Sequence, residues 1–155
     1  MEARSENANR FLGKRVLLVD DDPDFVAQER TLLELIGFEV QTAASAKEAE
    51  LLLVDKMPDL AIVDLMMEHP DAGFALCHHI KHMSKPGKEI PVILVSGVAA
   101  KTGLEFDAAT EEERSWVKAD AMLAKPLRFD QLSREISRLL NGTRHSAPVA
   151  RAARP

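Results

Sequence analysis

The sequence predicts an α/β fold, a doubly wound five-stranded parallel sheet with helices on both faces. Short apolar runs alternate five times with segments whose apolar residues recur at helical spacing, and this order is typical of repeated βα units. Several runs are almost continuous in Val, Leu, Ile and Ala, as in strands that are buried on both faces. With 155 residues, 46% of them hydrophobic, the chain can bury one core of this kind.

The first βα unit begins with a strand at 15–19. Asp22 followed by Pro23 is typical of a helix N-cap with proline at the first helical position. Apolar side chains then recur at helical spacing up to Gly37, where the helix is expected to stop.

The second unit has a short, partly alternating strand at 38–42. Ser45 and Glu48 form a capping box for the helix that follows, which is predicted to run to about residue 56.

The last three units follow the same pattern. A strand at 58–63 precedes a helix at 73–83, and a strand at 90–95 precedes a helix that starts at the capping box of Thr110 and Glu113. The fifth unit has a strand at 121–124 and an amphipathic helix from Phe129, with a stop at Asn141 and Gly142. That last sequence pair is typical of a helix end.

Three segments are expected along the chain. Residues 1–13 are predicted to form a flexible leader, residues 14–141 the folded domain, and residues 142–155 a disordered tail rich in Ala, Arg and Pro.

Composition excludes several classes of protein. The net charge of −5 gives no sign of nucleic-acid binding. The single cysteine, Cys77, excludes an internal disulfide and a cysteine-based zinc site. Neither a signal peptide nor a membrane span is evident, so a cytoplasmic protein without membrane contact is expected.

Polar side chains follow four of the five predicted strands. Because the carboxyl ends of parallel strands meet at one edge of a sheet, where open α/β sheets bind ligands, these side chains are expected to converge. They are Asp20, Asp21, Asp22, Asp64, Ser96 and Lys125. Asp22 is better explained as the N-cap than as a ligand, because Pro23 follows it.

The remaining set suits phosphoryl transfer to a carboxylate. Asp64 would be the acceptor, and a divalent metal would offset its repulsion from an anionic donor. Asp20 and Asp21 would supply the oxygen ligands that Mg²⁺ prefers. Lys125 would neutralise one phosphoryl oxygen, and Ser96 would donate a hydrogen bond to another.

Four motifs resemble the receiver domain of bacterial response regulators over about residues 14–141. They are VLLVDDD (16–22), PDLAIVDLMM (58–67), PVILVSG (91–97) and LAKP (123–126). The resemblance implies a (βα)5, flavodoxin-like receiver fold with strand order 2-1-3-4-5.

The resemblance also implies a role for each matching residue. Asp64 corresponds to the phosphorylation site. Asp20 and Asp21 correspond to the acids that, with Asp64 and the backbone carbonyl of Met66, bind Mg²⁺ or Mn²⁺.

Three further positions carry the signal in the family. Ser96 corresponds to the switch hydroxyl and Lys125 to the family's lysine, whose bond to Pro126 is expected to be cis. Met122 occupies the position at which receivers usually have an aromatic switch residue, so this chain lacks the ring of the usual rotamer switch there. The segment 99–109 is longer than usual.

The expected function is a stand-alone receiver. It would take its phosphoryl group from a sensor histidine kinase or a histidine phosphotransfer protein, and signal to a downstream protein or through a homodimer. No enzymatic activity is expected beyond self-phosphorylation and autodephosphorylation at Asp64. No second domain is expected after the last helix.

Two alternatives remain open. A degenerate receiver would act as a binding module that needs no phosphorylation, which the replacement at Met122 would suit. A phosphatase of the haloacid-dehalogenase type would use the acids of VDDDPD (19–24), but it gives Asp64 no role.

Overall fold

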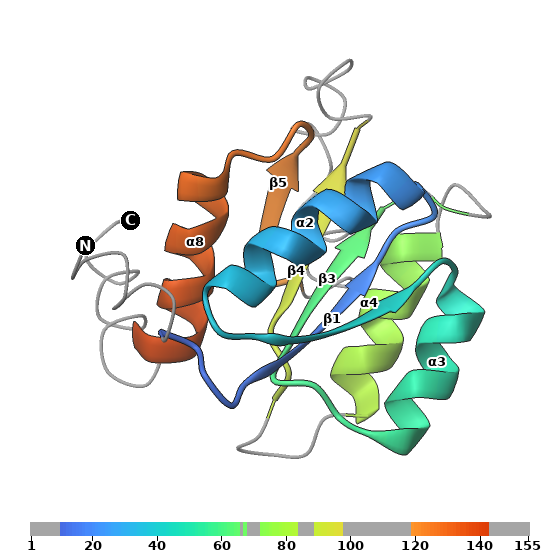
Figure 1. Ribbon diagram of the computed structural model, residues 1–155. Coiled ribbons are helices and arrows are strands. Elements are labelled where there is room, and N and C mark those ends of the chain that lie inside the picture. Colours follow the sequence, from blue (N-terminus) through green and yellow to red (C-terminus); the bar gives the residue numbers. More distant parts are fainter. Residues whose placement is uncertain (1–9, 66, 68–71, 84–88, 98–118, 143–155) are drawn as a thin grey trace, which may run out of the picture.

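The computed structural model of the chain describes residues 10–65, 67, 72–83, 89–97 and 119–142. They form one parallel sheet in the order β2-β1-β3-β4-β5 (Figure 1), which confirms the predicted fold and strand order. The strands are β1 (Arg15–Val19), β2 (Glu39–Ala43), β3 (Leu60–Asp64), β4 (Val92–Ser96) and β5 (Ala121–Ala124). The described helices are α2 (Pro23–Leu35), α3 (Ala46–Asp55), α4 (Ala72–Met83) and α8 (Phe129–Ser137), and a π-helical turn at Arg138–Gly142 continues α8. Within these residues, no helix has both the length and the apolar character that a membrane crossing requires.

Some of the predictions fall elsewhere in the chain. The helix predicted from Thr110, the segment 99–109, Met66 and the tail from residue 143 onward lie outside the described residues.

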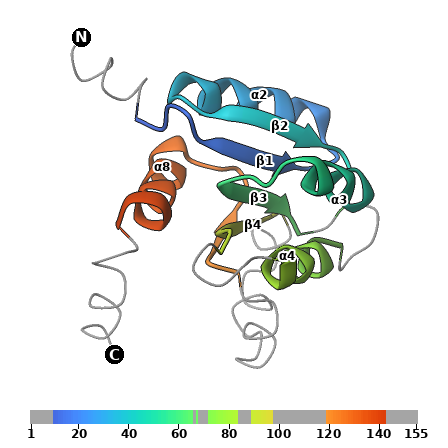
Figure 2. The same cartoon turned by 90° about the horizontal axis from the view of Figure 1, so that it is seen from below.

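The helices lie in two layers, one on each face of the sheet. Helices α2 and α8 cover one face and α3 and α4 the other (Figure 2). Side chains of β1 alternate between the two faces: Val16 and Leu18 pack with α2 and α8, whereas Leu17 and Val19 pack with α3 and α4. All five residues of β3 and of β4 are buried, as the continuous apolar runs predict for central parallel strands.

Both capping predictions within the described residues are confirmed. The Asp22 side chain accepts the N–H of Asp24 at 3.0 Å, and Pro23 opens α2. At the start of α3, the Ser45 hydroxyl accepts the N–H of Glu48 at 3.1 Å. The Glu48 carboxylate in turn accepts an N–H from Ala44 at 2.8 Å, so this second bond of the capping box goes to the residue before the N-cap.

The folded core begins earlier than the predicted boundary at residue 14. Phe11 is only 2% exposed and stacks on Phe38, with ring centroids 4.8 Å apart. Its N–H donates to the carbonyl of Ile36 at 3.0 Å. The sequence interpretation placed Phe11 in a flexible leader because an isolated aromatic in a polar segment has no periodicity, but its ring fills the end of the core beneath α2.

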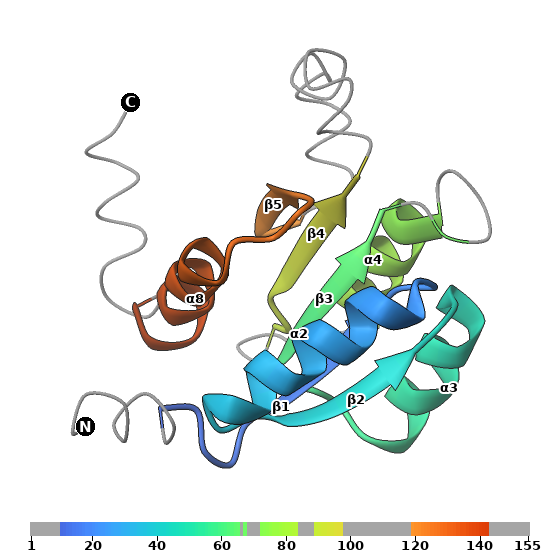
Figure 3. The same ribbon diagram turned by 45° about the horizontal axis from the view of Figure 1, so that its top comes forward.

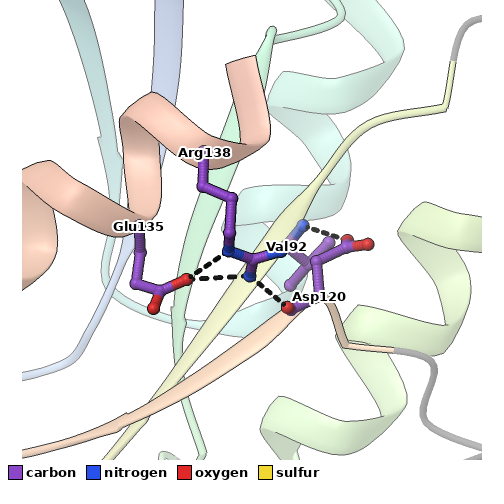
Figure 4. Close-up of polar contacts among 4 residues, drawn as sticks. All are labelled: Val92, Asp120, Glu135 and Arg138. Carbon is purple, nitrogen blue, oxygen red and sulfur yellow. Dashed lines mark hydrogen bonds and ion pairs between the residues drawn. The ribbon is translucent and has the colours of Figure 1, made fainter. Parts of the chain in front are cut away.

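Asp120 joins four elements at the end of the sheet opposite the strand carboxyl termini. Its carboxylate pairs with the Lys81 ammonium of α4 at 2.6 Å and accepts the N–H of Val92 in β4 at 2.8 Å. Its carbonyl accepts a hydrogen bond from Arg138 at 3.0 Å, and Arg138 also pairs with Glu135 of α8 at 2.8 Å (Figure 4). This network fixes the start of β5 against α4, β4 and α8.

Candidate functional site

The carboxyl ends of the strands meet at one edge of the sheet (Figure 3). Asp20 follows β1, and Asp64 is the last residue of β3, its direct neighbour. Ser96 ends β4 and pairs with Ala124, the residue before Lys125. The backbone N–H of Lys125 donates to the carbonyl of Ser96 at 3.1 Å. The topology therefore brings together four residues that are up to 105 positions apart.

Three carboxylates form an acidic cluster here. Asp20, Asp21 and Asp64 each offer an oxygen, and these oxygens lie within 4.8 Å of one another. Asp20 and Asp64 are 2% and 6% exposed, whereas Asp21 is exposed at the mouth of the cluster. Hard carboxylate oxygens with one open side suit Mg²⁺, which binds few protein ligands and keeps several waters. The donor set therefore fits a divalent cation of this kind.

Asp20 is held in place at both oxygens. One oxygen accepts the backbone N–H of Asp22 at 2.9 Å, and the other pairs with the Lys125 ammonium at 2.8 Å. Because the Asp20 side chain is almost fully buried, removal of its cationic partner would leave an unpaired buried charge. The first contact is local, since Asp20 and Asp22 are two positions apart in the sequence.

The Lys125 ammonium lies among three partners. It is 2.8 Å from Asp20, 3.9 Å from Asp64, and 4.3 Å from the centre of the Phe25 ring. The Lys125–Pro126 peptide bond is cis, the form that the resemblance implies. One ammonium faces three carboxylates, so the site keeps an excess of negative charge that a divalent cation would balance.

A family model for the response regulator receiver domain matches residues 16–137 of this chain. The chain belongs to the receiver domain family. Receiver domains work in two-component signalling, where they pair with histidine kinases and bind Mg²⁺ at an acidic pocket. This membership decides against the haloacid-dehalogenase alternative.

Curated relatives agree with the family. The chain is 32% identical over 138 residues to a probable transcriptional regulator, ycf27, of Guillardia theta, covering 86% of this chain and 48% of that protein. It is 34% identical over 120 residues to Protein PilG of Pseudomonas aeruginosa, covering 77% of this chain and 82% of that protein. The chain spans about half the length of several curated relatives that it matches, among them the DNA-binding regulator RpaA of Synechocystis.

Solved structures share the fold. A CheY-like receiver domain protein from Methanospirillum hungatei superposes with a TM-score of 0.66 at 28% identity, covering 86% of this chain and 98% of that chain. The response regulator TrrA from Thermotoga maritima, in complex with Mg²⁺ and BeF, gives a TM-score of 0.65 at 26% identity, covering 82% and 99%.

Two glycines of this receiver shape the space around Asp64 and Lys125. Gly73, near the start of α4, donates its N–H to the carbonyl of Leu65 at 2.8 Å. A Cβ at Gly73 would overlap the backbone of Asp64 and lie 2.6 Å from the Leu65 carbonyl oxygen, so only glycine fits. Among the described residues, the atom nearest to a Cβ at Gly97 would be the Lys125 Cδ, at 3.9 Å, which is an ordinary van der Waals contact.

Met122 and Ser96 belong to β5 and β4, two neighbouring strands of the sheet. Met122 is the second residue of β5, is half-buried, and packs against the cluster beneath α3 and α4. Ser96 is 2% exposed at the end of β4. The carbonyl of Met66, the fourth expected metal ligand, lies outside the described residues.

Phe25 is a neighbour of the receiver's site that sequence reasoning missed. Its position in the first turn of α2 fitted the apolar face of that helix, which is where it also packs. Its place over the Lys125 ammonium depends on the relation between α2 and the end of β5, 100 residues later. The only signal in the sequence is that the aromatic Phe25 follows the acidic residues 20–22 at the end of β1 by about one helical turn.

Proposed function

We propose that this receiver accepts a phosphoryl group on Asp64 from a histidine kinase or a histidine phosphotransfer protein, in a reaction that requires Mg²⁺ or Mn²⁺. The observation that carries the proposal is the Lys125 ammonium between Asp20 and Asp64, next to a cluster of three carboxylates. A carboxylate meant only to form a structural ion pair would need neither the other two acids nor an open side.

The transfer would proceed at the Asp64 carboxylate. One of its oxygens attacks phosphorus as the bond between phosphorus and the donor's imidazole nitrogen breaks, and that nitrogen keeps the bonding electron pair and takes up a proton. A bound Mg²⁺ would neutralise charge on the phosphoryl oxygens. Asp20 and Asp21 would hold this cation, Lys125 would balance a further oxygen, and the Ser96 hydroxyl would donate a hydrogen bond to another.

The output is proposed to be a separate protein or a homodimer. The chain covers 82% of PilG and 48% of ycf27, so proteins of both lengths are among its relatives. The only chemistry proposed for the domain itself is the gain of the phosphoryl group at Asp64 and its later hydrolysis.

Replacement of the acceptor tests the proposal. Wild-type protein and the variants Asp64→Asn and Asp55→Asn would be incubated with Mg²⁺ and ³²P-labelled acetyl phosphate. Asp55 is an exposed acid at the end of α3, far from the strand carboxyl ends, so it serves as a matched control. Wild type and Asp55→Asn are expected to incorporate label that EDTA prevents, and Asp64→Asn is expected to stay at background. If Asp64→Asn incorporated as much label as wild type, Asp64 would not be the acceptor.

A further inference from the structure

The Phe25 ring contacts the Lys125 ammonium, the group expected to pair with a phosphoryl group on Asp64. The Lys125 ammonium lies 4.3 Å from the ring centre, inside the range in which the negative face of an aromatic ring attracts a cation. The same ammonium pairs with Asp20 at 2.8 Å but is 3.9 Å from Asp64. In the present state, therefore, Lys125 is bound closely to Asp20 and Phe25 and only loosely to Asp64.

Phosphorylation changes the balance between these partners. A phosphoryl group would raise the negative charge at Asp64 and carry it outward from the strand end. A divalent cation at the acidic cluster would at the same time compete with the ammonium for the oxygens of Asp20. Both changes move the most favourable position of the Lys125 ammonium away from Asp20 and toward Asp64.

The ring is built into α2 rather than into β5. Phe25 lies in the first turn of α2, is half-buried, and packs against the core cluster between α2, α8 and the sheet. At Met122, in β5, the chain carries a flexible thioether side chain on the opposite face of the sheet. Among the described residues, Phe25 is the aromatic side chain in contact with the Lys125 ammonium.

We propose that Phe25 is the aromatic residue that responds to phosphorylation in this receiver: its ring holds the Lys125 ammonium in the free protein, releases it when the ammonium moves toward a phosphoryl group on Asp64, and repacks so that the first turn of α2 changes. This inference rests on the proposed function of Asp64. It places the response on the α2 face of the domain.

Nuclear magnetic resonance of the full chain tests the contact directly. Ring current should shift the Lys125 ε-methylene signal upfield from those of other lysines, and comparison with Lys125→Arg assigns that signal. Phe25→Leu should abolish the shift. Phe129→Leu is the matched control, since Phe129 is also a half-buried ring against the same core cluster. An identical Lys125 signal in wild type and Phe25→Leu would overturn the contact.

Addition of Mg²⁺ and beryllofluoride, an analogue of a phosphoryl group, tests the response. The Lys125 signal should move toward the other lysines, and amide signals at the start of α2 should shift in wild type and Phe129→Leu but much less in Phe25→Leu. The chain has no tyrosine, so ¹³C-tyrosine labelling of Phe25→Tyr reports on this ring alone, and its signals should shift as well.

The possible failures can be told apart. If beryllofluoride binds wild type but not Asp64→Asn, and the Phe25→Tyr ring and the α2 amides do not respond, the proposed function stands and the role of Phe25 is wrong. If beryllofluoride does not bind wild type, or binds Asp64→Asn equally well, the proposed function fails and the role of Phe25 fails with it.

Discussion

Glu29 places a carboxyl group where α2 faces the hydrophobic core. It lies one turn beyond Phe25 and one turn before Leu33, and it is only 3% exposed. Burial raises the pKa of the Glu29 carboxyl above its ordinary value of 4.5, because the charged form loses its hydration. The folded state therefore binds this proton more tightly than the unfolded state does.

The first prediction concerns the pH dependence of stability. Glu29 favours the folded state most below the ordinary glutamate pKa, and this contribution is lost as the pH rises through the raised pKa of the folded state. Glu29→Gln should therefore flatten the decline of the unfolding free energy as the pH rises above 4.5, the ordinary glutamate pKa. Urea unfolding of both proteins at several pH values measures this dependence of the unfolding free energy on pH.

Glu50→Gln provides the control for this measurement, because Glu50 is an exposed glutamate on α3. Its slope against pH should equal that of wild type. A Glu29→Gln protein with the wild-type slope would show that Glu29 has the same proton affinity in both states.

At the scale of elements, the contact between β3 and α4 leaves no room for a side chain. A Cβ at Gly73 would overlap the backbone around Asp64. Helix propensity alone favours Ala over Gly by about 1 kcal/mol. The overlap is with backbone rather than with a flexible side chain, so it cannot be relieved unless α4 moves away from the end of β3.

We therefore expect Gly73→Ala to destabilise the domain by about 1–3 kcal/mol, the usual cost of overpacking, despite the gain in helix propensity. Gly97→Ala is the matched control, since its nearest contact within the described residues would be Lys125 Cδ at 3.9 Å, and it should change stability by less than about 0.5 kcal/mol. Urea unfolding distinguishes the two. A Gly73→Ala protein more stable than wild type would contradict the prediction, because it would mean that α4 can move away from the end of β3 without loss of stability.

Local signals explain which elements were predictable. The caps at Asp22 and Ser45 depend on only four or five consecutive residues, and both capping hydrogen bonds are present in the structure. Continuous apolar runs identify β3 and β4 within two residues, because strands buried on both faces leave no place for polar side chains.

Contacts between distant segments were predictable only where the topology of the sheet imposes them. The convergence of Asp20, Asp64 and Lys125 follows from parallel strands, so the sequence could anticipate it. The ring of Phe25 over Lys125 and the burial of Phe11 depend on how α2 and the chain before β1 pack, and no periodicity reports that. The π-helical turn that continues α8 at Arg138–Gly142 likewise has no local signal beyond the expected stop at Gly142.

At the scale of the whole molecule, the hydrophobic core reaches beyond the (βα)5 pattern to Phe11. We expect Phe11→Ala to lower the unfolding free energy by about 3–5 kcal/mol, because it removes a buried ring stacked on Phe38. Leu12→Ala should change it by less than about 0.5 kcal/mol, since Leu12 is 72% exposed. Denaturant unfolding of both variants measures the difference, and equal small effects would place the boundary of the core after residue 13.

Asp120 bears on how this receiver could change over evolution. It fixes the first residues of β5 against three other elements, directly before the strand that leads to Lys125. Ser96 and Lys125 are separated by 28 residues. Because the chain is clamped where it re-enters the sheet, insertions or deletions upstream of Asp120 need not alter the register of β5, and a longer loop costs little free energy by itself. The clamp thus separates variation in the length of the chain between Ser96 and Asp120 from the position of the lysine.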